Sequence, residues 1–289
     1  MKHVVDNPRQ PFESRTGLLE VHQVPAWEDN LIWVGVCKKS GTTFAVDGPD
    51  AGGTLAYCEA KGLELTTILN THTHGDHIGI NQDLERRGLL KSMRVIGSQK
   101  RAAEVPGLTE GVSEGDTVRV GELDVQVMLT EGHIDGHVSY LIDGVLFCGD
   151  TLFAGGCGYL FDGPPTKMFN SLSRLRGLDE DTHVCCAHEY TQDNMRFAWS
   201  VDADNAALAE RIRDVWAVRG AGGCTVPSTI GLERATNPFM RFDTPSLRER
   251  VAAAWPDRAL DTDADVFAAT RALKDRKDYR KHGDEGLPL

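Results

Sequence analysis

Length, composition and charge set the first limits on this chain. Its 289 residues, 40% of them hydrophobic, can bury a core without disulfides or other staples to hold the fold. The 43 acidic residues outnumber the 31 basic ones, and the net charge of −12 disfavours nonspecific binding of nucleic acid or anionic membranes. Residues 1–11 lack the apolar segment of an export signal, and no run reaches the roughly 18 apolar residues of a membrane span. We therefore expect a cytoplasmic protein.

The first half of the chain mixes strand and helix patterns. Apolar, β-branched runs predict strands at 18–24, 31–37, 43–46 and 65–69, and helical spacing predicts helices at 51–62 and 81–89. Most of the segment 93–148 has strand character, with turn residues between its runs. This order indicates an α/β layered core with a second sheet.

The last third changes character. Helical spacing recurs at 205–218 and across 246–280, where Pro256 interrupts it, and residues 219–229 resemble a Gly-rich connection. We therefore predict two domains, 1–192 and 193–289, the second one helical. Residues 1–18 are predicted to be an N-terminal arm that is either flexible or covers an edge of the sheet.

The strongest chemical signal is the run T-H-T-H-G-D-H at residues 71–77, which follows the strand expected at 65–69. Ligand-binding loops of α/β sheets lie at such carboxyl ends. Three imidazoles and a carboxylate in one short run would repel one another when the imidazoles are protonated, and divalent metals relieve this crowding. Because residues two apart point the same way in an extended loop, His72 and His74 can hold one ion while Asp76 and His77 face another.

Further candidate ligands stand after other apolar runs. His133, Asp150 and His188 each follow a strand-like segment, so distant parts of the chain can bring them together. Asp150 is the natural bridging ligand, because a carboxylate has two oxygens and neutralises charge that neutral imidazoles cannot.

The run at 71–77 and the separated His133, Asp150 and His188 together resemble the metallo-β-lactamase superfamily. Within it, the chain is most similar to glyoxalase II (hydroxyacylglutathione hydrolase). Four further segments carry this likeness: G-D-T-L-F at 149–153, G-C-G at 156–158, H-E-Y-T at 188–191 and N-P-F-M-R at 237–241. The resemblance extends from about Val21 to Arg280.

This resemblance implies a fold and a metal site. The fold is of the α/β (α+β) class, a four-layer αββα sandwich followed by a helical domain that covers the active site. The site would hold two divalent metal ions, with zinc the first expectation and iron or manganese also suited to imidazole and carboxylate ligands. The implied ligands are His72, His74 and His133 for the first ion, Asp76, His77 and His188 for the second, and Asp150 between them.

The resemblance also implies residues that bind the glutathione part of a substrate: Tyr159, Phe161, Tyr190, Lys274 and Lys277. Tyr190 belongs to H-E-Y-T, and the two lysines match a basic pair near the C-terminus of the family; their alternative interpretation is a solvated helical face. Tyr159 departs from the family, because most members carry Lys or Arg there.

The implied activity is that of a thioesterase which hydrolyses S-(2-hydroxyacyl)glutathione, such as S-lactoylglutathione, in methylglyoxal detoxification. Asp76 and Asp150 would be catalytic, the first by restraining the attacking hydroxide and the second by setting the metal spacing. The alternatives are hydrolysis of another thioester, a lactone or a phosphodiester, a mononuclear iron persulfide dioxygenase, and a noncatalytic metal-binding module. The expected partner is a small molecule, with neither nucleic acid nor membrane, and the chain would be a monomer or homodimer.

Overall fold

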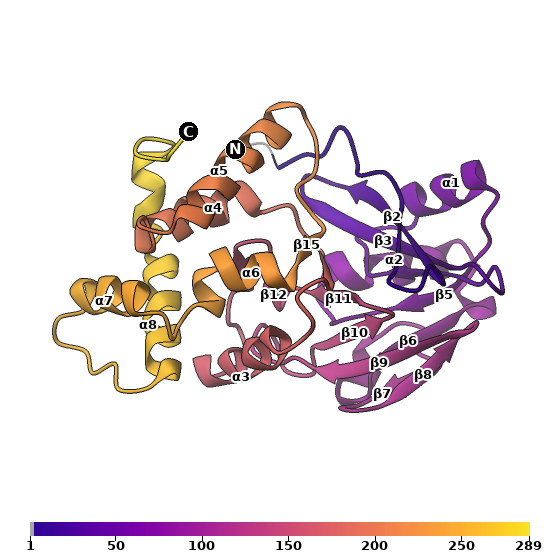
Figure 1. The fold of residues 1–289 in the computed structure, drawn as a ribbon. Helices are drawn as coiled ribbons and strands as arrows, with labels where there is room; N and C mark the ends of the chain where they lie inside the picture. The colour runs from indigo at the N-terminus through magenta and orange to yellow at the C-terminus, as the bar shows by residue number, and fades with distance from the viewer. Residues whose placement is uncertain (1–2) are drawn as a thin grey trace.

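The computed structural model describes residues 3–289, and its core is two stacked sheets (Figure 1). Within the described residues the first sheet has seven strands in chain order, of which β1 to β4 pair antiparallel and β4 to β7 pair parallel. They are β1 (Phe12–Glu13), β2 (Leu19–Ala26), β3 (Asn30–Cys37), β4 (Thr43–Val46), β5 (Leu65–Leu69), β6 (Arg94–Ser98) and β7 (Glu110–Val112).

The second sheet is mainly antiparallel, and β11 and β14 form its parallel pair. Its order is β15 (Ser228–Thr229), β14 (His183–Cys186), β11 (Val145–Gly149), β10 (Val138–Ile142), β9 (Leu123–Leu129) and β8 (Thr117–Val120). A short hairpin, β12 (Leu152–Phe153) with β13 (Gly156–Cys157), follows β11.

Alternation along the strands builds two hydrophobic layers. In β4, Phe44 and Val46 belong to the core between the sheets, whereas Ala45 faces the opposite side. There it shares a core with α1 (Gly52–Lys61) and α2 (Gly75–Arg86). The helix α3 (Pro165–Arg176) packs Met168 and Leu172 into the core of the second sheet. The predicted four-layer αββα sandwich is confirmed.

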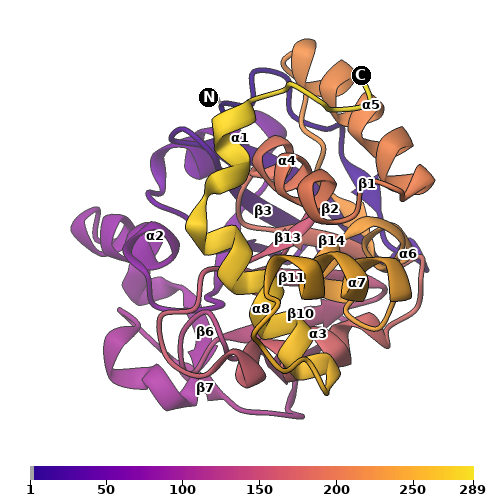
Figure 2. The ribbon, with the colours of Figure 1, turned by 90° about the vertical axis from the view of Figure 1, so that its left-hand side faces the viewer.

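The C-terminal third is helical and lies against one side of the sheets (Figures 1 and 2). Its α-helices are α4 (Thr191–Val201), α5 (Ala206–Gly220), α6 (Ile230–Thr236), α7 (Pro245–Ala254) and α8 (Asp263–Arg276), and two 3-10 helices, η3 (Pro238–Met240) and η4 (Asp278–His282), lie among and after them. Pro256 falls between α7 and α8, as its helix-breaking chemistry predicts. Residues 219–229 were interpreted as a connection without strands. This was wrong for the last two residues, Ser228 and Thr229, which form β15 and pair with β14. The domain boundary at 192 stays a prediction.

The described part of the N-terminal arm lies along the rest of the protein and contacts it. The strand β1 pairs with β2 and covers the edge of the first sheet, which agrees with the second expectation for this arm. The backbone N–H groups of Asp6 and Asn7 both donate to the Gly222 carbonyl, at 3.1 and 2.9 Å. Within residues 3–289, all cysteines are free and buried, and no helix has the length and apolarity needed to cross a membrane.

Candidate active site

The candidate metal-binding side chains come after the carboxyl ends of strands, and all of them except His133, which follows the antiparallel strand β9, come after strands with a parallel neighbour. The run 71–77 follows β5, which pairs in parallel with β4 in the first sheet. Asp150 and His188 follow β11 and β14, the parallel pair of the second sheet. Because such strands end at the same edge, their loops meet there, as in other α/β sheets.

The first cluster consists of His72, His74, His133 and Asp150, whose potential ligand atoms all lie within 4.8 Å of one another. Nδ1 of His74 lies 3.1 Å from Nε2 of His72 and 3.0 Å from Nε2 of His133. A shared proton can join only two such nitrogens at a time. One cation accounts for all three, and this donor set suits zinc, iron or manganese.

The second cluster consists of Asp76, His77 and His188. Nε2 of His188 lies 3.4 Å from Oδ2 of Asp76, and Nε2 of His77 lies 3.6 Å from the same oxygen. The His77 Nε2 atom is buried and has no hydrogen-bond partner within the described chain. Because buried polar atoms of folded proteins are almost always paired, this nitrogen points to a bound cation.

Asp150 stands between the two clusters and presents one oxygen to each. Its Oδ2 lies 3.4 Å from Nε2 of His133, and its Oδ1 lies 3.3 Å from Nε2 of His188 and 3.5 Å from Nε2 of His77. Oδ1 has no hydrogen-bond donor among the described residues either. The structure therefore brings all the predicted ligands together, and Asp150 has the position that a bridging ligand needs.

The charges of the site favour cations. Burial opposes protonation of His188, but the carboxylates of Asp150 and Asp29 outweigh burial and raise its pKa to about 9. Burial likewise opposes ionisation of Asp150, and the imidazoles of His188 and His77 nevertheless hold its pKa well below the usual range. Positive charge is thus stabilised in this cluster whether protons or metal ions supply it.

One prediction about the run 71–77 needs correction. The helix after the run was expected only at 81–89, but α2 begins at Gly75, so Asp76 and His77 lie in the first turn of a helix. His74 still has extended backbone, at φ −66° and ψ 151°. The expected division of the run between two clusters holds, because the chain turns from strand to helix between its two halves.

Carboxylates outside the predicted set hold the histidines. Oδ2 of Asp47 lies 2.9 Å from Nδ1 of His77, and Oδ1 of Asp29 lies 2.8 Å from Nδ1 of His188. These contacts leave Nε2 of each ring for the cluster. Asp47 directly follows β4 as the predicted ligands follow their strands, a signal that could have revealed it. Asp29 lies in the turn that joins the antiparallel strands β2 and β3, where aspartate is common for conformational reasons, so its position in the sequence indicates no ligand role.

A cavity of about 420 Å³ lies among α4, α8 and the loop after β13, and we call it the carrier pocket. It is lined by the predicted Tyr159, Tyr190, Lys274 and Lys277, and also by His3, Phe153, Cys157, Asp193, Asn194, Arg271, Asp275, Tyr279 and Arg280. Tyr190 connects it to the metal clusters, because its ring stacks on that of His188 at 4.8 Å and an interplanar angle of 3°.

Phe161 does not line the carrier pocket. Its ring lies edge-on to the imidazoles of His74 and His133, at centroid distances of 5.2 and 5.3 Å, and is 60% exposed. Phe161 therefore covers the first cluster from the solvent side.

The two lysines differ in their surroundings. Lys274 is buried, donates a hydrogen bond to Oδ1 of Asn194 and lies 5.4 Å from the ring centroid of Phe197. Burial lowers its pKa to about 7. The solvated-face alternative is wrong for Lys274, whereas Lys277, just after α8, is exposed.

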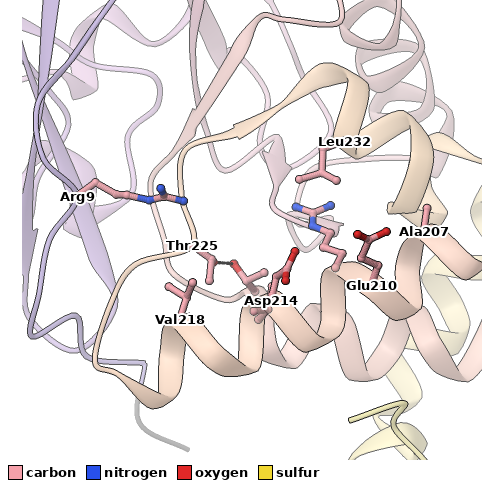
Figure 3. Close-up of a pocket in the computed structure, with 10 residues that line it drawn as sticks. Arg9, Ala207, Glu210, Asp214, Val218, Thr225 and Leu232 are labelled. Carbon is pink, nitrogen blue, oxygen red and sulfur yellow. Dashed lines mark hydrogen bonds between the residues drawn. The ribbon is translucent and has the colours of Figure 1, made fainter.

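A second cavity, of about 390 Å³, contains none of the predicted site residues (Figure 3). Figure 3 shows Arg9 of the N-terminal arm on one side and Glu210 and Asp214 of α5 on the other. Thr225 and Thr191 meet at its wall, with their hydroxyl oxygens 2.6 Å apart. The N-terminal arm therefore contributes a side chain to each cavity.

Comparison with solved structures and family models defines the class of protein. The metallo-β-lactamase superfamily model matches residues 42–188. The crystal structure of ETHE1 from Myxococcus xanthus has a TM-score of 0.58 at 22% identity, covering 87% of this chain and 98% of that one. That of the BLEG-1 B3 metallo-β-lactamase has a TM-score of 0.57 at 22% identity, covering 76% and 99%. The chain is a hydrolase of the metallo-β-lactamase superfamily.

Its relatives define the family more narrowly. The model of the hydroxyacylglutathione hydrolase C-terminus matches residues 189–277. A hydroxyacylglutathione hydrolase from Synechococcus sp. (strain JA-3-3Ab) is 45% identical over 260 residues, covering 89% of this chain and all of the relative. Another from Methylococcus capsulatus (strain ATCC 33009 / NCIMB 11132 / Bath) is 42% identical, covering 89% of this chain and 98% of the relative. The chain belongs to the hydroxyacylglutathione hydrolase (glyoxalase II) family.

Proposed function

We propose that this protein is a two-metal thioesterase that hydrolyses S-(2-hydroxyacyl)glutathione, and S-lactoylglutathione in particular, to a hydroxy acid and free glutathione. The observation that carries the proposal is the position of Asp150, whose two oxygens face two separate histidine clusters. The relatives named hydroxyacylglutathione hydrolase support the choice of substrate.

The proposed ligands are those predicted from the sequence. His72, His74 and His133 would hold one ion, Asp76, His77 and His188 the other, and Asp150 would contact both. Zinc is the first choice, and the same ligands suit iron and manganese. Bound divalent ions would polarise the thioester carbonyl and lower the pKa of water towards about 7.

The chain's own residues would orient the attacking water and the substrate. Asp76 belongs to the second cluster, its Oδ2 accepts a hydrogen bond from Nδ2 of Asn30 at 3.1 Å, and it can also accept a hydrogen bond from the attacking water. Tyr190, Lys274, Lys277 and Tyr159 would hold the thiol peptide in the carrier pocket, and Phe161 would keep solvent from the acyl group. The leaving thiolate is stable enough to depart without a general acid.

The test is hydrolysis of S-D-lactoylglutathione by the purified protein, with metal content measured on the same sample. We expect about two metal ions per chain and turnover that is lost in His74→Ala and Asp150→Ala. The exposed Asp124→Asn variant is the control for a surface change. Metal without turnover of this thioester would overturn the proposed substrate, and a metal-free active protein would overturn the site.

A thioester of a different thiol is a second candidate, and Tyr159 favours it. Most of the family has a cation at this position, whereas here a half-exposed phenol lines the carrier pocket. Assaying S-lactoyl derivatives of other thiols beside that of glutathione separates the two. The persulfide dioxygenase is less favoured, because both clusters have their full set of side chains.

We further propose a cytoplasmic role in methylglyoxal detoxification, as a monomer or homodimer. Cell fractionation tests the location, and the sensitivity of a deletion strain to added methylglyoxal tests the role in detoxification. Analytical ultracentrifugation tests the oligomeric state.

A further inference from the structure

Residues 3–11 of the N-terminal arm are attached to the helical part of the chain. Nη2 of Arg219 donates to the carbonyl oxygens of His3 and Val4, both at 2.9 Å. Further along the arm, Nε of Arg9 donates to the Cys224 carbonyl at 3.1 Å. The Val5 side chain is buried in the main core. The arm is therefore fixed in place, and the position of His3 follows from these contacts.

His3 lies at the wall of the carrier pocket. Its ring lies edge-on to that of Tyr190, with centroids 5.5 Å apart. Nδ1 of His3 lies 3.1 Å from the Glu189 carbonyl oxygen. Since a carbonyl can only accept, Nδ1 carries the hydrogen, and in a neutral ring Nε2 then holds a lone pair. No described residue hydrogen-bonds to Nε2.

Several other polar groups of the carrier pocket already have partners. Arg271 pairs with Asp275, and Arg280 pairs with Asp193. An N–H group of a bound peptide-like thiol can therefore use acceptors that have no donor among the described residues, and His3 Nε2 is one of them, beside Oδ2 of Asp275.

We propose that the N-terminal arm holds His3 in the wall of the carrier pocket and that His3 determines specificity for the thiol carrier by accepting a hydrogen bond from one of its N–H groups. This inference rests on the proposed thioesterase function. It assigns His3 to the carrier and not to the reacting thioester, so its effect is on substrate binding.

The test compares His3→Ala and His3→Phe with the wild type on two substrates. S-D-lactoylglutathione has amide N–H groups, whereas the lactoyl thioester of 2-mercaptoethanol has none. Both variants should raise KM for the first substrate by about 3- to 10-fold, the effect of one hydrogen bond, and leave kcat unchanged. Neither should change KM for the second. The adjacent Val4→Ala, at a side chain that does not line the pocket, is the matched control.

Two outcomes would overturn the role of His3: an unchanged KM in His3→Ala, or wild-type KM in His3→Phe, which would mean that ring packing alone matters. Calorimetric binding of S-methylglutathione separates this failure from failure of the thioesterase function. Wild-type binding that His3→Ala weakens by the same factor supports the role of His3 even without turnover. If the wild type does not bind, the inference is overturned together with the proposed substrate.

Discussion

The carboxylate of Asp47 and the imidazole of His77 form a buried pair in which Oδ2 lies 2.9 Å from Nδ1. Asp47 also accepts hydrogen bonds from the backbone N–H and the hydroxyl of Thr71, at 2.8 and 2.6 Å. One carboxylate therefore fixes the start of the run 71–77 and orients a histidine in the helix that follows it.

This relationship predicts a metal-binding defect in Asp47→Asn. The amide keeps the volume but must turn its N–H₂ towards either His77 or Thr71, both of which donate to Asp47. Loss of such an outer carboxylate lowers metal affinity by about 10- to 100-fold. Competition with a chromogenic chelator measures this, and Asp124→Asn on the exposed face of β9 is the control. Equal affinities in Asp47→Asn and the wild type would show that Asp47 does not hold the site.

Gly158→Ala should damage the site through sterics alone. A Cβ at this position would lie 2.1 Å from the Asp150 carbonyl oxygen and 2.9 Å from Nδ1 of His133. Displacement of reacting groups by about 1 Å can reduce turnover on the order of 10²-fold. Gly220→Ala has no atom within 4 Å of the new Cβ and should keep full activity. Wild-type turnover in Gly158→Ala would contradict the packing described here.

Lys274 predicts a dependence of stability on pH. Its folded pKa is lowered to about 7, and that of an unfolded lysine is about 10.4. Between these values the unfolded chain holds a proton that the folded chain lacks, so this residue makes the free energy of unfolding rise with pH. Below pH 7, where Lys274 is protonated in the folded chain too, the fold bears the full cost of a buried charge.

The variant Lys274→Met removes that cost. Its gain in stability over the wild type should be largest at or below pH 7 and should shrink by about 2 kcal/mol between pH 7 and pH 9. Denaturant unfolding at several pH values measures this. Lys277→Met, at an exposed position, should show no such trend, and a pH-independent difference for Lys274→Met would mean that its pKa is not lowered.

Tyr159→Lys should restore the cation that most of the family has. The side chain is 53% exposed, so stability should change by less than about 0.5 kcal/mol. An exposed charge pair with a substrate carboxylate should lower KM for S-D-lactoylglutathione by about 2- to 5-fold, and less in high salt. Leu89→Lys makes the same change in charge outside the pocket. Unchanged KM in Tyr159→Lys would show that the carboxylates bind elsewhere.

Much of the site was predictable because its ligands obey a local rule. His72, Asp150 and His188 follow apolar strands within a few residues. Both the strands and the residue types that bind metals can be recognised from the sequence. The same rule, applied to Asp47 after β4, would have extended the prediction by one residue.

The remaining features depend on contacts between distant segments. The burial of Lys274 requires Asn194 and Phe197 from α4, and the position of His3 requires Glu189 and Arg219. A lysine on a helix has the same local pattern whether that face is covered or solvated. Only tertiary packing distinguishes the two cases, so the solvated-face alternative could not be decided beforehand.

Thr229 pairs with His183 and Ser228 pairs with Val184, so a strand from the C-terminal part of the chain completes the second sheet. The two predicted domains therefore cannot be separated at residue 192 without breaking this pairing. A chain that ended at residue 192 would leave β14 as an open edge, next to the loop that carries His188, and open edges invite association between copies. A chimera that exchanges the helical part between relatives should therefore keep β15 with its own sheet and place the junction after residue 229.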